Sequence, residues 1–248
     1  MTGISEAVIL MAGEGSRLRG SDDTFLKPFV QLLGRPLISY VLDALSRAGI
    51  KTVNFVVGYE SGRMIEQARQ LIPAGLSVSF IENRDWQKQN GISLLAAADC
   101  VSKPFFLTMS DHLFDGALVG RLLDSFEPGL LSIGVDRKLD SIFDLEDAMK
   151  VQTRGNRIAD IGKNLRHYNA IDSGLFVCPL QFFDYLERAK SGSSGSDCSL
   201  ADGVRLMAGD DRVRAIDIGD AWWQDVDTPE MLQYAERQIS KHMQSAAT

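Results

Sequence analysis

The alternation of short apolar runs with helix-like segments is the feature that most constrains the fold of this chain. Strands are expected at residues 7–12, 52–57, 77–81 and 104–109, with helices between them at residues 35–48, 62–71 and 91–99. Strands separated by single helices are typical of a mostly parallel sheet covered by helices. The N-terminal part of the sequence therefore predicts an α/β fold.

Beyond residue 128 the pattern changes to closely spaced strands with few helices between them. Strands are expected at residues 129–135, 148–152, 157–161, 173–177, 215–218 and 222–226, helices at 182–189 and 229–242, and a polar loop at 191–196. Neither a repeat nor a linker divides the sequence, and 248 residues, 45% of them hydrophobic, suffice for one core. We predict a single domain over residues 1–248, in which residues 129–177 form a small inserted antiparallel lobe.

The formal net charge of −7 disfavours a nucleic-acid partner, which would require clustered lysines and arginines. A nucleotide ligand stays compatible with this charge, because a divalent cation can lie between acidic side chains and phosphates. The N-terminus has no basic stretch typical of a secretory signal, and no apolar run reaches the roughly 18–20 residues of a membrane helix. The three scattered cysteines, Cys100, Cys178 and Cys198, suit a reducing compartment. We therefore expect a cytoplasmic protein without membrane insertion, and no pattern predicts its oligomeric state.

A glycine-containing loop follows the first expected strand and predicts a phosphate site. Glycine allows positive φ and lets backbone amides approach anionic oxygens. Arg17 and Lys27 add positive charge, and we predict that both are catalytic, because cations stabilise charge that develops on phosphates. The alternative is a plain chain reversal. The predicted nucleotide-binding residues of the loop are Met11, Ala12, Gly13, Gly15 and Ser16.

The loop differs from two common glycine-rich motifs. It matches neither the G-x-x-x-x-G-K-[ST] pattern nor the full G-x-G-x-x-G dinucleotide pattern. The missing third glycine and the charges of Arg17 and Lys27 disfavour an NAD-binding oxidoreductase.

Two acidic segments follow expected strands far apart in the sequence. Asp111 comes after the strand at 104–109, and Asp225 and Asp227 follow the run that begins at Trp222. Carboxylates from two strand ends are suitable ligands for Mg²⁺ when phosphate oxygens complete its coordination. We predict Asp111 and Asp227 as metal ligands and Asp225 as structural; the alternative for Asp227 is a helix cap. His112 is not assigned as a general base, because none is needed if the attacking group is an ionised phosphate.

The N-terminal segment resembles the opening of the sugar-1-phosphate nucleotidyltransferases. The similar residues are the run from Ala7 to Leu18, Lys27-Pro28, and the segment from Leu33 to Leu37. Met11 departs from the usual small residue, and Lys27 precedes a proline where many members have the proline first. The resemblance covers essentially the whole chain. It implies a Rossmann-like nucleotidyltransferase fold, a nucleoside triphosphate and a phosphomonoester as substrates, and release of pyrophosphate.

Later segments are similar to the cytidylyltransferase domain that makes CDP-inositol from CTP and inositol 1-phosphate. These segments lie around Asn90, Ser110–His112, Ile161–Arg166, Ile171–Val177 and Trp223–Thr228. The resemblance implies Mg²⁺ as cofactor, and it implies that Asn90, Gly91 and Ser93 face the cytidine. It places Asp136, Lys150, Lys163 and Asp172 at the acceptor. In some organisms that domain is fused to a membrane-embedded phosphotransferase, and we expect this chain to lack it.

The sequence allows alternatives for several residue roles, for the acceptor and for the class of protein. From the residues alone, Asn90 and Ser93 could equally cap a helix, Lys150 and Lys163 could face solvent, and Asp172 could shape a turn. The acceptor could be phosphocholine, another phosphorylated alcohol or a sugar 1-phosphate. A non-catalytic nucleotide-sensing module is the alternative from another class. The combination of two cations and two separated aspartates favours an enzyme.

Overall fold

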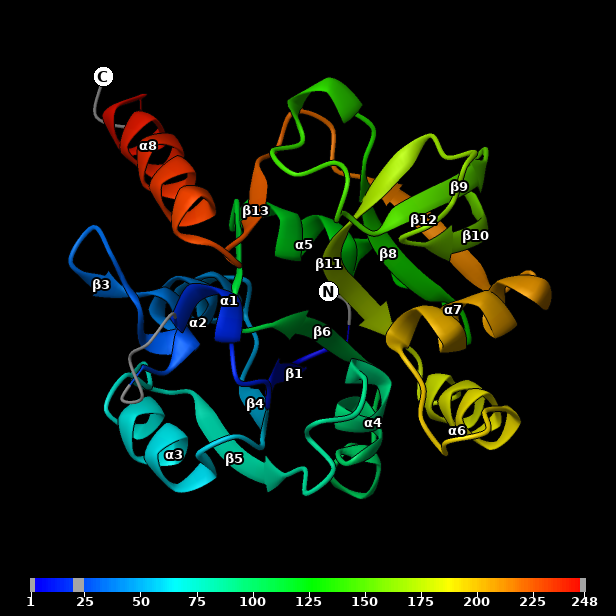
Figure 1. The fold of residues 1–248 in the computed structure, drawn as a ribbon, viewed down its shortest axis with the longest axis horizontal. Helices are drawn as coiled ribbons and strands as arrows, with labels where there is room; N and C mark the ends of the chain where they lie inside the picture. The colour runs from blue at the N-terminus through cyan, green and yellow to red at the C-terminus, as the bar shows by residue number, and fades with distance from the viewer. Residues whose placement is uncertain (1–2, 20–24, 246–248) are drawn as a thin grey trace.

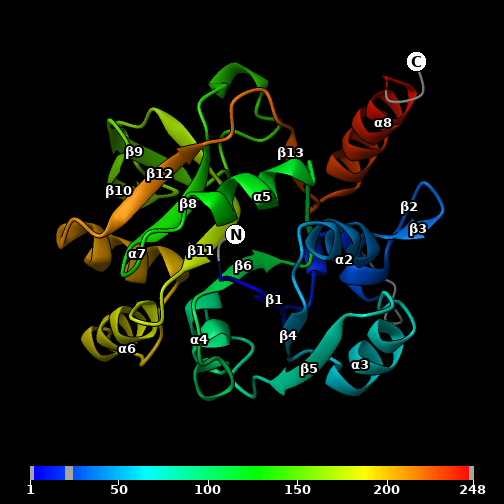
Figure 2. The same cartoon turned by 180° about the vertical axis from the view of Figure 1, so that it is seen from behind.

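The computed structural model describes residues 3–19 and 25–245. Its centre is a nine-stranded mixed sheet in the order β5-β4-β1-β6-β11-β8-β12-β10-β9, with helices on both faces (Figures 1 and 2). The predicted fold class, an α/β nucleotidyltransferase fold with a mixed sheet, is confirmed.

The N-terminal part of the sheet is parallel; its inner strands are largely buried on both faces, whereas its edge strand is only partly buried. It contains β5 (Ser77–Glu82), β4 (Thr52–Val57), β1 (Glu6–Met11) and β6 (Phe105–Met109). Successive residues of β1 alternate between two apolar clusters, because neighbouring side chains of a strand point to opposite faces. One face is covered by α2 (Leu37–Arg47), α3 (Ser61–Arg69) and α5 (Ala117–Asp124). The other is covered by α4 (Asn90–Leu95), α6 (Phe182–Gly192) and α7 (Leu200–Gly209).

The C-terminal strands are mostly antiparallel and curl at the end of the same sheet. β11 (Ala170–Cys178) pairs antiparallel with β6 and with β8 (Leu131–Asp136). β12 (Val213–Asp217) pairs parallel with β8, whereas β10 (Arg157–Gly162) and β9 (Lys150–Arg154) form a hairpin. Because β9 also pairs with β11, the strands beyond β6 close on one another. These strands, together with the segments between them, are called the lobe below.

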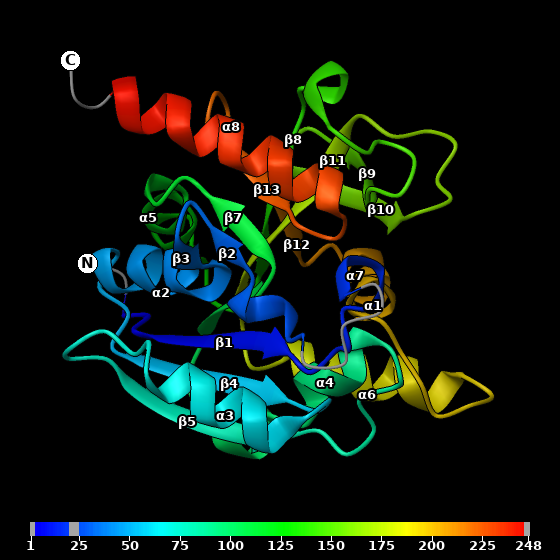
Figure 3. The ribbon, with the colours of Figure 1, turned by 60° about the vertical axis from the view of Figure 1, so that its left-hand side comes forward.

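Small elements connect these layers. They are α1 (Ser16–Arg19) and the 3-10 turns at Lys27–Phe29, Ala98–Cys100 and Leu139–Ser141. A longer helix, α8 (Pro229–Ser245), ends the described chain. Two short antiparallel pairs join β2 (Gln31–Leu32) to β3 (Arg35–Pro36), and β7 (His112–Phe114) to β13 (Trp223–Asp225). Figure 3 shows α8 beside β13, on the side of the molecule away from α3. Within residues 3–19 and 25–245, no helix is long and apolar enough to span a membrane.

Several predicted boundaries were wrong. The helix expected at 35–48 begins only at Leu37, because Arg35 and Pro36 pair with the preceding strand. The helix expected at 91–99 ends at Leu95, before a separate 3-10 turn. The helices α5 and α7 were not predicted, since each is short and contains an interior glycine, which lowers helix propensity. The strand β7 was also missed.

Candidate active site

Two cavities meet at the carboxyl ends of the parallel strands β1 and β6. The first, of about 390 Å³, is lined by the loop after β1 and is called the loop cavity here. The second, of about 510 Å³, is lined mainly by the lobe and is called the lobe cavity. Both are lined by Asn90, Met109, Asp111 and Asp227. Open α/β sheets bind ligands at this edge, so both cavities are candidate ligand sites.

Most residues of the glycine-containing loop line the loop cavity. Gly15 has a φ of +67°, and a Cβ there would lie 2.7 Å from Cβ of Lys27. The loop can pass this close to Lys27 only because residue 15 is glycine. The structure therefore brings together all the residues predicted for this loop: Met11, Ala12, Gly13, Gly15, Ser16, Arg17 and Lys27.

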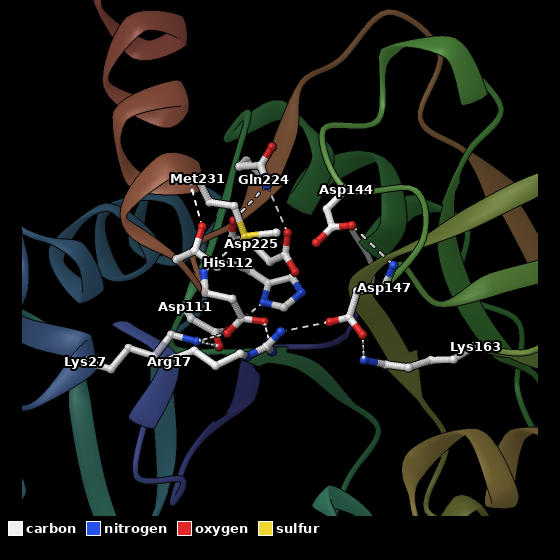
Figure 4. Close-up of polar contacts among 12 residues, drawn as sticks. Arg17, Lys27, Asp111, His112, Asp144, Asp147, Lys163, Gln224, Asp225 and Met231 are labelled. Atoms are coloured by element: carbon white, nitrogen blue, oxygen red, sulfur yellow. Dashed lines mark hydrogen bonds and ion pairs between the residues drawn. The ribbon is translucent and has the colours of Figure 1, made fainter. Parts of the chain in front are cut away.

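Lys27 is buried where the two cavities meet. Its ammonium donates to the carboxylates of Asp111 and Asp227, which the sequence separates by more than a hundred residues (Figure 4). Burial lowers the pKa of Lys27, but the two carboxylates outweigh it, and the pKa is raised. Burial likewise raises the pKa of Asp111, but Lys27 and His112 hold it far below its ordinary value. Lys27 and Asp111 therefore both stay charged at neutral pH.

Arg17 connects this cluster to the lobe. Its guanidinium donates to Asp227 and, through Nη1, to Oδ2 of Asp147 at 2.9 Å. The other oxygen of Asp147 accepts from Nζ of Lys163 at 2.6 Å. The hydrogen bond from Lys163 is the largest cause of a lowered pKa of Asp147, and Arg17 adds to it. An ion-pair chain therefore runs from the loop cavity to the lobe cavity.

His112 is fixed between three neighbours. Its Nδ1 lies 2.7 Å from Oδ1 of Asp111, and its ring stacks on Trp223 at 6.3 Å between centroids. A Cβ on Gly174, whose φ is +72°, would lie 2.3 Å from the imidazole. Burial lowers the pKa of His112, but the pKa is raised because Asp111 and the more distant Asp225 outweigh it. His112 thus orients Asp111, and its two carboxylate neighbours favour the protonated form of its imidazole.

Three of the four predicted acceptor residues line the lobe cavity: Asp136, Lys163 and Asp172. Asp136 is buried and accepts from the backbone of Lys138 at 2.8 Å and from Nε1 of Trp223 at 3.0 Å. Asp172 accepts from the amide of Gly174 at 2.8 Å, and burial raises the pKa of Asp172 to about 6. The carboxylate of Asp136 therefore shapes the cavity wall, whereas Asp172 offers a polar group to a ligand.

Lys150 differs from the other predicted acceptor residues. It is buried and lines neither cavity among those described. Its Nζ donates to the backbone oxygens of Glu146 at 2.8 Å, Lys163 at 2.9 Å and Ala148 at 3.4 Å. In this arrangement Lys150 holds the backbone around the lobe cavity, and its contact with an acceptor stays a prediction.

Of the three residues predicted to face the cytidine, two line the loop cavity and one does not. Asn90 and Ser93 line the loop cavity, whereas Gly91 packs against Cys198. Asn90 accepts from the amide of Leu200 at 2.9 Å, so it joins α4 to α7 rather than capping its own helix. Ser93 accepts from Nδ2 of Asn83 at 3.0 Å, which leaves its hydroxyl hydrogen available to a ligand.

Sequence reasoning missed several residues that line the cavities. Trp86 and Lys88 line the loop cavity, and Asp147 and Trp223 line the lobe cavity. Trp86 and Lys88 follow the carboxyl end of β5, so the strand-end rule could have identified them. Asp147 has no local signal, because its partner Arg17 lies 130 residues away in the sequence.

Residues 7–138, more than half of the chain, match the family model described as the MobA-like NTP transferase domain. The chain belongs to this family. The matched segment of this NTP transferase contains the glycine loop, Lys27 and Asp111, whereas Asp227 and Lys163 lie beyond it.

Individual relatives of this NTP transferase are more specific. The chain is 34% identical over 235 residues to the "Bifunctional IPC transferase and DIPP synthase" of Rubrobacter xylanophilus, covering 94% of the chain and 51% of the relative. It thus spans about half the length of the curated relatives it matches. The solved inositol-1-phosphate CTP transferase from T. maritima superposes with a TM-score of 0.83 at 29% identity and covers 96% of both chains. A UDP-glucose pyrophosphorylase in complex with UDP-glucose (TM-score 0.79, 16% identity, 96% of this chain and 99% of that chain) shares the fold.

Proposed function

We propose that this chain transfers CMP from CTP to inositol 1-phosphate and releases pyrophosphate. The observation that carries the proposal is the position of Lys27, Asp111 and Asp227 at the junction of two cavities, one beside a phosphate-type loop. The likeness to the inositol-1-phosphate CTP transferase along nearly the whole chain supports the choice of nucleotide and acceptor.

The reaction in this proposal is an in-line displacement. A phosphate oxygen of the acceptor forms a bond to the α-phosphorus of the triphosphate, and the bond to the bridging oxygen of pyrophosphate breaks. The attacking phosphate is already ionised, so no general base is required. Arg17 and Lys27 stabilise the charge that develops on the triphosphate, because preorganised cations need no rearrangement during the reaction. Binding in two adjoining cavities orients the reacting groups.

We assign Asp111 and Asp227 as the ligands of a divalent cation, with Mg²⁺ as the expected ion. The two carboxylates converge on one ammonium, so a single cation lies within reach of both. Among the described residues no group of three or more His, Cys, Asp or Glu side chains could hold a metal. A site with two carboxylates suits Mg²⁺, which completes its coordination with water and substrate phosphates. When bound, the ion would neutralise phosphate charge.

The acceptor is assigned to the lobe cavity. Lys163 offers a positive charge to the phosphate, and Asp172 offers a hydrogen-bond partner to polyol hydroxyls. The nucleotide is assigned to the loop cavity, which Asn90 and Ser93 line. We place this activity in the cytoplasm.

The decisive experiment measures pyrophosphate release from each of five nucleoside triphosphates combined with phosphorylated polyols, amino-alcohols and sugars, with Mg²⁺ present. The expected result is a single dominant combination, CTP with inositol 1-phosphate. Preference for phosphocholine or a sugar 1-phosphate would transfer the assignment to that acceptor. Nucleotide binding without pyrophosphate release in any combination would indicate the sensing module instead.

A further inference from the structure

Asp147 lies in the segment between the 3-10 turn at Leu139–Ser141 and β9, at the border of the two cavities. Its two carboxylate oxygens are bound by different cations, Oδ2 by Arg17 at 2.9 Å and Oδ1 by Lys163 at 2.6 Å (Figure 4). Arg17 belongs to the loop cavity and Lys163 to the lobe cavity. The carboxylate of Asp147 therefore binds one cation from each of the two cavities.

The same two cations lie at the border of the cavities, within reach of a phosphomonoester that enters the lobe cavity. A carboxylate and a phosphate present similar anionic oxygens to arginine and lysine. Lys138, the other lysine that lines the lobe cavity in the described part of the chain, is bound to Asp136 and to the backbone of Gly219. An acceptor phosphate that enters the site therefore finds Arg17 and Lys163 already bound to Asp147.

The backbone that carries Asp147 is held from both sides. Lys150 donates to the carbonyls of Glu146 and Ala148, which are the two neighbours of Asp147. The amide of Asp147 donates to Asp144. These contacts fix the segment, so the carboxylate is presented at one place.

The ion pairs themselves are exchangeable. The side chains of Arg17, Asp147 and Lys163 are 54%, 40% and 50% exposed, whereas that of Lys27 is only 10% exposed. Ion pairs at such exposure contribute little to stability and are screened by water. An incoming phosphate can therefore displace the Asp147 carboxylate without breaking a structural interaction.

We propose that Asp147 is an internal competitor of the acceptor phosphate: its carboxylate occupies Arg17 and Lys163 until that phosphate displaces it. The proposal rests on the proposed function in that the displacing group is an acceptor phosphate. Competition from Asp147 weakens every phosphate by the same factor. Inorganic phosphate, which has no further contacts, then binds only at higher concentration, whereas an acceptor with further contacts in the lobe cavity keeps enough affinity to bind.

The kinetic test compares Asp147→Asn with Asp140→Asn, which removes the same charge from an exposed position in the preceding 3-10 turn. In Asp147→Asn, the KM for inositol 1-phosphate should fall by about threefold to tenfold, since the lost pairs are half exposed. The inhibition constant of inorganic phosphate should fall by the same factor, whereas kcat should change less than twofold. Asp140→Asn should match the wild type. An unchanged or raised KM in Asp147→Asn would overturn the proposal, and a raised KM would make Asp147 an acceptor ligand.

A binding experiment separates this proposal from the proposed function. Calorimetric titration of inorganic phosphate into the wild type, Asp147→Asn, Asp147→Ala and Asp140→Asn needs no turnover. If phosphate binds more tightly to both Asp147 variants, but not to Asp140→Asn, than to the wild type, displacement is supported. This holds even if no acceptor yields pyrophosphate and the proposed function fails. Equal binding in all four proteins overturns the role of Asp147, even if the wild type is an active cytidylyltransferase.

Discussion

Two sets of ion pairs lie next to each other at the junction of the cavities and differ mainly in burial. In the first, Lys27 is 10% exposed, and its partners Asp111 and Asp227 are 22% and 20% exposed. In the second, Arg17, Asp147 and Lys163 are all at least 40% exposed. Both sets join segments that are far apart in the sequence.

The difference in burial gives the two sets different roles. Removing one partner of a buried pair leaves an uncompensated charge and destabilises by roughly 3–5 kcal/mol, whereas an exposed pair contributes about 0–1 kcal/mol. The Lys27 pairs can therefore fix the geometry at which a phosphate reacts. The Asp147 pairs can instead open and close as ligands enter.

The largest effect is expected from breaking the buried set. Lys27→Ala should lower turnover by about a thousandfold or more, because it removes a preorganised cation from the reacting phosphates. The measurement is pyrophosphate release with CTP and inositol 1-phosphate, with circular dichroism to establish that the fold is intact. Lys51→Ala, at an exposed lysine, is the control. Near-normal turnover in Lys27→Ala would contradict the assigned role.

The second largest effect is expected from the metal. Chelation with EDTA should lower turnover by about a hundredfold or more, because the charge of the phosphates is no longer neutralised. Added Mg²⁺ should restore turnover. Asp227→Asn should raise the Mg²⁺ concentration for half-maximal turnover, whereas Asp140→Asn should leave it unchanged. Full activity in EDTA would remove the metal from the proposed reaction.

The third prediction concerns Gly174, which packs against His112, the residue that supports Asp111 in the buried set. A Cβ there would lie 2.3 Å from His112, so Gly174→Ala must displace the imidazole that holds Asp111. We expect a loss of about 2–4 kcal/mol in the free energy of unfolding, measured with urea, and a clear loss of turnover. Gly155 also has a positive φ, +64°, but open space around it. Gly155→Ala should therefore cost only about 1 kcal/mol, the conformational part, and equal losses in both variants would exclude the steric contact.

A pH dependence is expected from Asp172, which belongs to neither set of ion pairs. Burial raises its pKa to about 6, although the Gly174 amide and His112 act in the opposite direction. A raised folded pKa contributes stability below the ordinary pKa of 3.8, and this contribution is lost as the pH rises through about 6. Asp172→Asn should therefore gain stability relative to the wild type between pH 4 and pH 7, on the order of 1 kcal/mol. Urea unfolding across this range measures it, and a pH-independent difference would contradict the raised pKa.

The comparison also explains how much of the site the sequence could predict. The phosphate loop and Asp111 follow neighbouring strands, β1 and β6, and each is signalled by an apolar run that ends in glycine or aspartate. Strand-end reasoning also identified Asp227, although the approach of β13 to β7 was not foreseen. These residues converge because parallel strands present their carboxyl ends at one edge.

The exposed set was not predictable in the same way. Arg17, Asp147 and Lys163 meet through contacts across 130 and 16 residues, and Asp147 stands in an irregular segment without periodicity. Lys150 and Gly174 also depend on tertiary packing, since one turns to backbone carbonyls and the other accommodates a ring. Local patterns therefore predict which residues stand at strand ends, but not which exposed charges meet above them.

The smallest effect is expected at an exposed ion pair away from the cavities. This pair tests whether exposure alone explains the kinetic effect predicted for Asp147. The pair between Arg157 and Asp211 is 59% and 49% exposed, close to the exposures of Arg17 and Asp147, but neither residue lines a described cavity. Arg157→Gln should change the free energy of unfolding by at most about 0.5 kcal/mol and should leave the KM for the acceptor and the phosphate affinity unchanged. Position at the border of the cavities, rather than exposure, would then account for the kinetic effect at Asp147. A shift in KM in Arg157→Gln would show instead that loss of any exposed charge alters the acceptor affinity through the net charge.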